Sequence, residues 1–120
     1  MLFNWIIFLA YTVLVYQTAV LPPNRIPKFW LHVNDKLSHG LQYFLLFWAA
    51  WNAFRKIQKW NPRAAAGALF YCAVLGILTE FSQLHVPGRQ ADLKDWLADM
   101  AGAVLGLLLL KFLASSRRKA

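Results

Sequence analysis

The chain alternates between long apolar runs and short polar connections. Four apolar runs cover about residues 2–21, 36–54, 63–82 and 95–114. An α-helix of roughly 20 apolar residues crosses the hydrocarbon core of a membrane. The pattern therefore predicts an all-α fold: a polytopic membrane protein built as a bundle of four transmembrane helices, in a single domain of residues 1–120.

Proline, asparagine and aspartate mark where the runs begin and end. Pro22-Pro23 ends the first run, because proline lacks the amide donor. Asp35, or Asn34 before it, is placed to cap the second helix. Asn61-Pro62 is typical of a helix start, with asparagine as the cap and proline at the first position. Pro87-Gly88 stops the third run.

The composition argues against a soluble protein. Hydrophobic residues make up 59% of the 120 residues, charged residues only 15%, and the mean hydropathy is +0.41. A small domain has a high ratio of surface to volume, so it could not bury this much apolar surface. A soluble helical protein with a large apolar core is the alternative that this excludes.

The charged residues separate by sign along the chain. The net charge of +8 equals the charge of two basic clusters, which are Arg55, Lys56, Lys59 and Arg63, and Lys111, Arg117, Arg118 and Lys119. All five acids belong to the opposite ends of the runs. Short basic clusters beside apolar runs follow the positive-inside rule, so we expect both termini in the cytoplasm and the acidic connections outside. The same distribution favours membrane lipids over nucleic acid as the partner.

Small residues recur every four positions in the last run, at Ala98, Gly102 and Gly106. In lipid such a stripe permits close helix packing. We expect it to pack inside the bundle, with a homo-oligomer through the same stripe as the alternative.

Polar residues fall on single faces of three predicted helices. Helical spacing aligns Asp35, His39 and Tyr43 on one helix, Glu80 and Gln83 on the next, and Asp95 and Asp99 on the last. Ionisable groups near hydrocarbon are costly unless they pair or face the bundle interior. We therefore expect these faces to meet at the outer mouth of the bundle.

His39 has three interpretations. It is a neutral imidazole bonded to Asp35 or Tyr43, a general acid/base oriented by a carboxylate, or a metal ligand with Glu80 and Asp95. The sequence holds no H-E-x-x-H motif and no paired cysteines, so it predicts no metal and no cofactor.

The other charged residues also leave alternatives open. Arg89 either pairs with Asp92 or Asp95, or binds an anionic group, because guanidinium matches phosphate and carboxylate in shape. Asp99 lies deeper in its helix, where a structural hydrogen bond is the expected role.

The order and spacing of these residues resemble the VanZ-like family. The match rests on Asp35-Lys36-x-x-His39 with Tyr43, on Glu80-x-x-Gln83 and Val86-Pro87-Gly88-Arg89, and on Asp95, Leu97-Ala98-Asp99, Gly102 and Gly106. It covers about half of the chain. Two positions depart from it, since many relatives carry an acid at the position of Gln42 and a histidine at that of Ser82.

The resemblance implies a small, multi-pass protein of the bacterial inner membrane. The family's name-giving member is linked to low-level resistance to the glycopeptide teicoplanin. We expect an outward-facing polar pocket that binds an anionic lipid or a lipid-linked cell-wall precursor. The alternatives are an enzyme acting on a lipid headgroup and a non-catalytic assembly protein. The candidate catalytic residues are His39, Glu80 and Asp95, and the candidate binding residues are Asp35, Lys36, Tyr43, Gln83, Arg89, Asp92 and Asp99.

Overall fold

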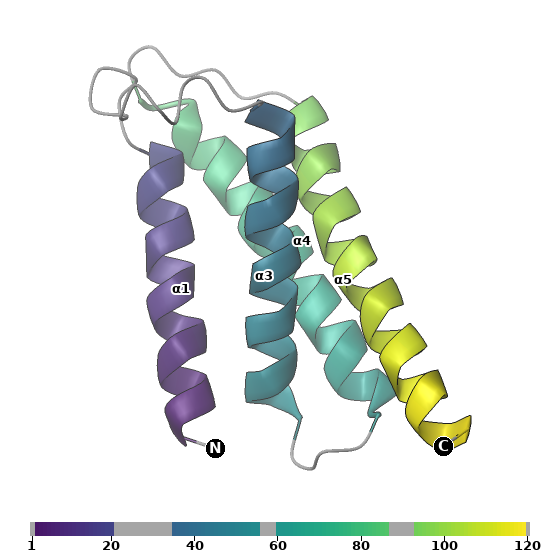
Figure 1. The fold of residues 1–120 in the computed structure, drawn as a ribbon. Helices are drawn as coiled ribbons and strands as arrows, with labels where there is room; N and C mark the ends of the chain where they lie inside the picture. The colour runs from purple at the N-terminus through teal and green to yellow at the C-terminus, as the bar shows by residue number, and fades with distance from the viewer. Residues whose placement is uncertain (1, 21–34, 56–59, 87–92, 120) are drawn as a thin grey trace.

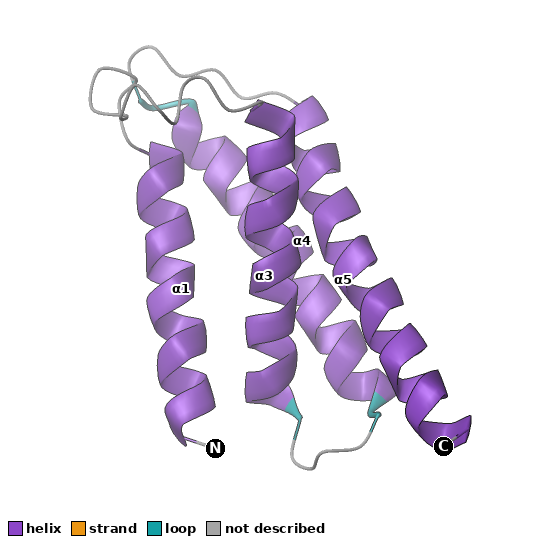
Figure 2. Ribbon diagram, viewed as in Figure 1, coloured by secondary structure: helices purple, strands orange, loops and turns teal. Residues whose placement is uncertain are grey.

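Four helices account for nearly all of the chain that the structure describes. The computed structural model describes residues 2–20, 35–55, 60–86 and 93–119, without the side chains of residues 35–36 and 117–119. Within these ranges all regular structure is helical (Figure 2). The helices are α1 (Leu2–Val20), α3 (Asp35–Phe54), α4 (Pro62–Gln83) and α5 (Leu93–Lys119). The all-α prediction is confirmed.

The start of α4 follows the sequence closely. Asn61 has an extended backbone with φ −135°, and its side chain accepts hydrogen bonds from the amides of Arg63 at 3.0 Å and Ala64 at 3.4 Å. These amides have no partner within the helix, so the asparagine cap satisfies them. The cap predicted at Asn61 is confirmed. Asn34, Pro22-Pro23 and Pro87-Gly88 lie outside the described residues.

α3 is the central helix of the bundle. It packs against α1, α4 and α5, and α1 also packs against α4 (Figure 1). Both ends of the described chain lie at the same end of the bundle, which is also where α3 ends and α4 begins. The start of α3, the end of α4 and the start of α5 lie together at the opposite end. This arrangement brings three predicted polar faces to one end.

α3 and α5 approach each other most closely where glycines face across the contact. A Cβ added to Gly102 would overlap the backbone carbonyl of Gly40. One turn further along α5, a Cβ at Gly106 would lie 3.0 Å from the Phe47 ring. The small-residue stripe therefore packs inside the bundle, as predicted. A homo-oligomer through Ala98, Gly102 and Gly106 stays a prediction, and it would have to displace α3.

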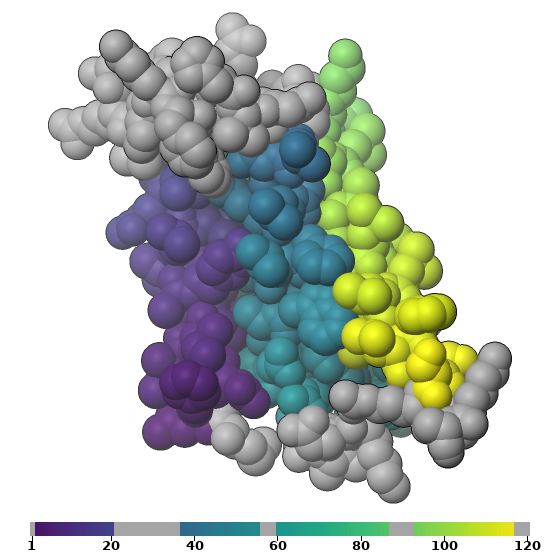
Figure 3. All heavy atoms as spheres, in the orientation of Figure 1, coloured from purple at the N-terminus to yellow at the C-terminus, as the bar shows by residue number. Residues whose placement is uncertain are grey.

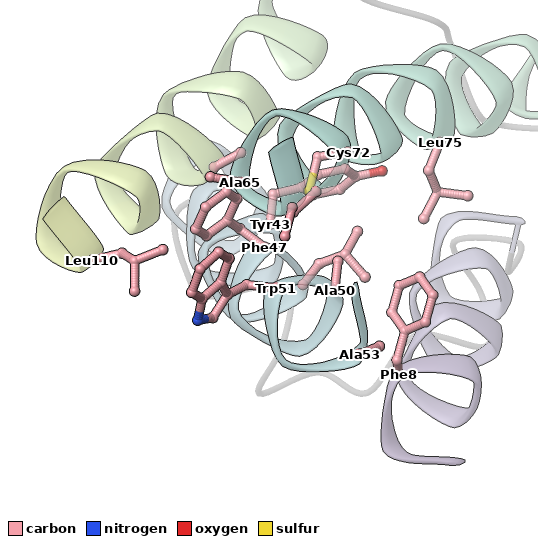
Figure 4. Close-up of a cluster of buried hydrophobic side chains, with 14 of the residues drawn as sticks. Phe8, Tyr43, Phe47, Ala50, Trp51, Ala53, Ala65, Cys72, Leu75 and Leu110 are labelled. Atoms are coloured by element: carbon pink, nitrogen blue, oxygen red, sulfur yellow. The ribbon is translucent and has the colours of Figure 1, made fainter. Parts of the chain in front are cut away.

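The core becomes more aromatic toward the end that holds the termini. Phe8 of α1 makes edge contacts with Phe54 and Tyr71, with ring centroids 5.3 and 4.7 Å apart, and Figure 4 shows Phe8 beside Ala53 of α3. Aromatic rings bury large areas and favour such edge-to-face contacts. This cluster holds α1 against α3 and α4.

The outer faces of the helices carry large apolar side chains. Phe70, Phe112 and Leu105 are 71%, 66% and 60% exposed, and all three lie well inside their helices. Figure 3 shows the side of the bundle that α1, α3 and α5 form. An apolar surface of this extent is typical of a protein that sits in lipid.

Three helices are long and apolar enough to cross a membrane. They are Leu2–Val20, Pro62–Gln83 and Leu93–Ser116. The chain is thus a multi-pass membrane protein by the length and composition of its helices. α3 is not among the three, because its sequence includes polar residues such as His39, Gln42 and Asn52. That α3 is a fourth span stays a prediction.

We expect Gly102→Val to destabilise the fold, because the added side chain would meet the backbone of Gly40. Overpacking of this kind typically destabilises by about 1–3 kcal/mol, and backbone offers less relief than a flexible side chain. Ala101→Val is the matched control, since Ala101 is exposed on the same helix. Thermal unfolding in detergent should show a lower midpoint for Gly102→Val only. Equal midpoints for the two variants would contradict the close approach of α3 and α5.

Candidate functional site

His39, Glu80 and Asp99 come from three helices and meet at one end of the bundle. His39 lies one turn into α3, Glu80 lies in the last turn of α4, and Asp99 lies near the start of α5. These helix ends lie together, opposite the chain termini (Figure 1). The prediction that polar faces of α3, α4 and α5 meet is confirmed for these residues.

A short hydrogen bond joins His39 to Asp99. The distance from His39 Nδ1 to Asp99 Oδ1 is 2.7 Å, which is short for a bond of this type. Asp99 is completely buried, and the side chain of His39 is 14% exposed. The sequence left Asp35 or Tyr43 as the expected partner of His39, but the structure pairs it with Asp99. The structural hydrogen bond expected for Asp99 is present, and its partner is the candidate catalytic histidine.

The glycine contact between α3 and α5 explains this pairing. Gly40 follows His39 directly, and a Cβ at Gly40 would lie 3.6 Å from the carbonyl oxygen of Ala98, the residue before Asp99. The two backbones are therefore close at the level of the His–Asp pair. Since Asp99 and Gly102 lie one turn apart on the same face of α5, the glycine contact fixes the carboxylate against α3.

The second carboxylate oxygen of Asp99 lies at α4. Oδ2 is buried and has no hydrogen-bond partner within the described part of the chain. A Cβ added to Gly76 would lie 3.5 Å from this oxygen, and 2.8 Å from the Trp96 ring. The Trp96 indole therefore occupies the position that a side chain at Gly76 would take, beside Oδ2. That indole donates a hydrogen bond to the carbonyl of Ala73 at 3.2 Å.

Glu80 completes the cluster. One side-chain ligand atom from each of His39, Glu80 and Asp99 lies within 4.8 Å of the others. Glu80 is half-buried and lies beside Asp99, which is fully buried. An imidazole and two carboxylates this close can exchange a proton or hold a cation.

The remaining candidate residues are placed differently. Asp95 is 8% exposed and lies one turn before Asp99, outside the three-residue cluster. Tyr43 is buried one turn beyond His39. Gln83 is turned toward α1, where its amide donates to the carbonyl of Ala19 at 2.9 Å. The side chains of Asp35 and Lys36, and all of Arg89 and Asp92, lie outside the described residues.

The sequence analysis grouped Asp95 with His39 and Glu80 and listed Asp99 among the binding residues, whereas in the structure Asp99 is the aspartate beside His39 and Glu80. Asp95 and Asp99 share one helix face, so the spacing alone cannot say which of them meets His39. The signal that selects Asp99 is its position one turn before Gly102, at the level of the Gly40 contact.

The two departures from the family pattern both contribute to contacts with α1. Tyr11 donates to the backbone carbonyl of Gln42 at 3.0 Å, and the hydroxyls of Tyr16 and Ser82 lie 3.1 Å apart. Neither Gln42 nor Ser82 belongs to the three-residue cluster.

The chain was compared with families of known proteins, with curated proteins and with solved structures. A model of the VanZ/LLP1 family matches residues 2–114. The chain belongs to the VanZ/LLP1 family. Neither a curated protein nor a solved structure matched it. Membership confirms the resemblance seen in the sequence and agrees with membrane-spanning helices. The chemistry of this VanZ/LLP1 protein has to be argued from its own residues.

We expect the His39–Asp99 bond to appear as coupling between two substitutions. His39→Gln and Asp99→Asn should each lower the free energy of unfolding, and the double variant should lose less than the sum. Coupling within such a pair is about 0.5–3 kcal/mol. Unfolding in mixed micelles, followed by circular dichroism, measures all four states of the cycle.

The control is a second cycle that pairs Asp99 with His85 in place of His39. His85 is an exposed histidine just beyond α4. His85→Gln and Asp99→Asn should be additive. Additivity in the His39 cycle as well would show that the hydrogen bond contributes nothing to stability.

Proposed function

We propose that this VanZ/LLP1 protein is a four-span protein of the bacterial inner membrane that binds the polar headgroup of an anionic lipid or lipid-linked envelope molecule. The headgroup binds at the outward end of the bundle, beside His39, Glu80 and Asp99. The supporting observation is that three ionisable side chains, with Asp99 fully buried and His39 and Glu80 partly buried, meet between helices whose outer faces are apolar. Ionisable groups kept at such a depth are usually functional.

The exposed surface of α3 supports its role as the fourth span. Leu37, Leu41 and Leu45 are 66%, 59% and 47% exposed and form one stripe along the helix. His39, Gln42 and Asn52 are less exposed than these leucines. A helix whose exposed side chains are leucines can cross the membrane, even though residues that face the rest of the protein lower its average hydropathy.

The direction of insertion follows from the two ends of the bundle. Arg55 and Arg63, which flank the connection between α3 and α4, and the basic C-terminal end of α5 belong to the end that also holds both termini (Figure 1). Basic residues remain on the cytoplasmic side during insertion. Both termini are then cytoplasmic, and the cluster is near the outer surface.

We expect reporter fusions at Lys59 and Gly88 to report opposite compartments. A cytoplasm-active reporter should work at Lys59, and a periplasm-active reporter should work at Gly88, because α4 separates the two positions. Fusion at Ser116 is the internal control and should match Lys59. The same compartment at Lys59 and Gly88 would overturn four spans, and reversed compartments would overturn the orientation.

A lipid headgroup is the ligand that this position favours. The side chain of His39 is 14% exposed, on the face of α3 opposite the lipid-facing Leu37 and Leu41. The headgroup of a molecule anchored in the membrane would therefore reach the cluster from the outer end of the bundle. Lys36 and Arg89 are close to the cluster in the sequence, and we assign them to the anionic part of the headgroup. A changed susceptibility to teicoplanin in a deletion strain is the corresponding phenotype.

A second candidate function is acid/base catalysis on the same headgroup. It is favoured by the 2.7 Å bond from His39 to Asp99. A carboxylate that accepts from Nδ1–H leaves Nε2 as the proton acceptor and stabilises the imidazolium that forms. Nε2 would take the proton of a water or a headgroup hydroxyl, so that one O–H bond breaks and one N–H bond forms.

We expect the wild-type protein to co-purify with one class of anionic lipid. Arg89→Ala should lower the amount of bound lipid at least several-fold, because it removes a cation matched to the headgroup. Mass spectrometry of bound lipids measures this. Lys111→Ala is the control, because Lys111 lines a hollow at the other end of the bundle with Trp60, Ala114 and Ser115. Unchanged lipid in Arg89→Ala would overturn the binding proposal in favour of a purely structural polar network.

The same samples, incubated with envelope lipid extract, test the second candidate. A product formed by the wild type and lost in folded His39→Ala supports catalysis. Bound lipid without any product after a broad screen leaves binding alone as the function.

A further inference from the structure

We propose that His39, Glu80 and Asp99 form a binding site for one divalent transition-metal ion of the zinc or manganese type. The ion would hold the anionic headgroup. Its link to the headgroup rests on the proposed function, whereas the ion site rests on the cluster alone. The sequence predicted no metal here, since no metal-binding motif is present.

The geometry of the cluster is the first argument. Three ligand atoms, one from each residue, lie within 4.8 Å of one another, which a small adjustment of side chains brings around a single ion. They come from α3, α4 and α5, so the site spans the helices that form the bundle's polar end. The 2.7 Å bond between His39 and Asp99 already holds two of the three side chains together.

The buried Asp99 carboxylate is the second, independent argument. Asp99 is completely buried, yet its Oδ2 atom has no hydrogen-bond partner among the described residues. A buried charged oxygen without a donor is strongly unfavourable. The Trp96 indole packs over Gly76 on this side of the carboxylate, and its N–H already donates to the carbonyl of Ala73. A bound cation would satisfy Oδ2, which receives no hydrogen bond from the described residues.

The ligand types select the class of ion. Magnesium and calcium prefer oxygen ligands throughout, so the imidazole of His39 argues against them. Soft ions prefer thiolates, and Cys72 is not part of the cluster. One imidazole and two carboxylates suit zinc or manganese. Three protein ligands also leave a coordination position open for an external oxygen.

The charges explain why an ion would matter for an anionic headgroup. The described cluster holds two carboxylates, which repel a phosphate or carboxylate of a lipid. A divalent ion balances the two carboxylates and presents positive charge at its open position. A lipid phosphate could then bind a site that is acidic by sequence.

The test measures zinc binding to the full chain in detergent micelles, with the affinity tag removed and metals stripped by chelator. Equilibrium dialysis with elemental analysis should give one zinc per chain. Glu80→Gln and Asp99→Asn keep side-chain size and should each weaken binding more than about tenfold. His85→Ala and His85→Gln are the matched controls, because His85 is an exposed histidine near the same end of the bundle and outside the cluster, and both should bind like the wild type.

Cobalt serves as a second probe that needs no variant. Wild-type protein titrated with Co²⁺ should develop visible absorption bands that saturate at one ion per chain and disappear on addition of zinc. Less than one zinc per chain, or equal affinity in Glu80→Gln, Asp99→Asn and the controls, would overturn the proposal. If a variant fails to fold, the cobalt titration of the wild type still tests the ion site. Absence of saturable absorption bands would overturn the proposal.

Lipid retention separates this inference from the proposed function. Chelation should reduce the anionic lipid that stays bound to the wild type, and added zinc should restore it. Retained lipid in a chain that binds no zinc overturns only the ion site. One zinc per chain with no bound lipid overturns only the headgroup proposal.

Discussion

The close approach of α3 and α5 at Gly40 and Gly102 determines much of the structure. A side chain at Gly102 would overlap the backbone of Gly40, whereas a Cβ at Gly40 would lie 3.6 Å from the carbonyl oxygen of Ala98. Close packing of this kind is a main source of stability between helices in lipid, where the hydrophobic effect no longer drives association. Here it also has a chemical result, because His39 directly precedes Gly40 and Asp99 lies one turn before Gly102. The contact that holds the helices thereby sets the distance between an imidazole and a carboxylate.

The sequence predicted the helices well because their determinants are local. Length and hydropathy located α1 and α4 to within a residue or two, and Asn61 capped α4 as expected. The predicted fourth span ended at about residue 114, and the helix itself continues through charged residues to Lys119. Apolar periodicity shows where lipid ends, and a helix can extend beyond that point into water.

The candidate site was predicted only in part because it depends on how helices rotate against each other. Helical spacing placed His39, Glu80 and Asp99 on inward faces, and all three meet. Spacing could not rank Asp95 against Asp99, which differ by one turn on the same face. Nor could it show that Gln83 turns toward α1, since an amide near a helix end fits a ligand site and a helix contact equally well. Three-dimensional packing decides both points.

The bond from Gln83 to the Ala19 carbonyl has a consequence for where α1 ends. Ala19 lies in the last turn of α1, where backbone carbonyls have no partner within their own helix. A side chain of α4, which is itself only 2% exposed, supplies the missing donor. The end of α1 is therefore capped by a side chain from another helix, 64 positions later in the chain. The last turn of α1 therefore gains this hydrogen bond only when α4 packs against it.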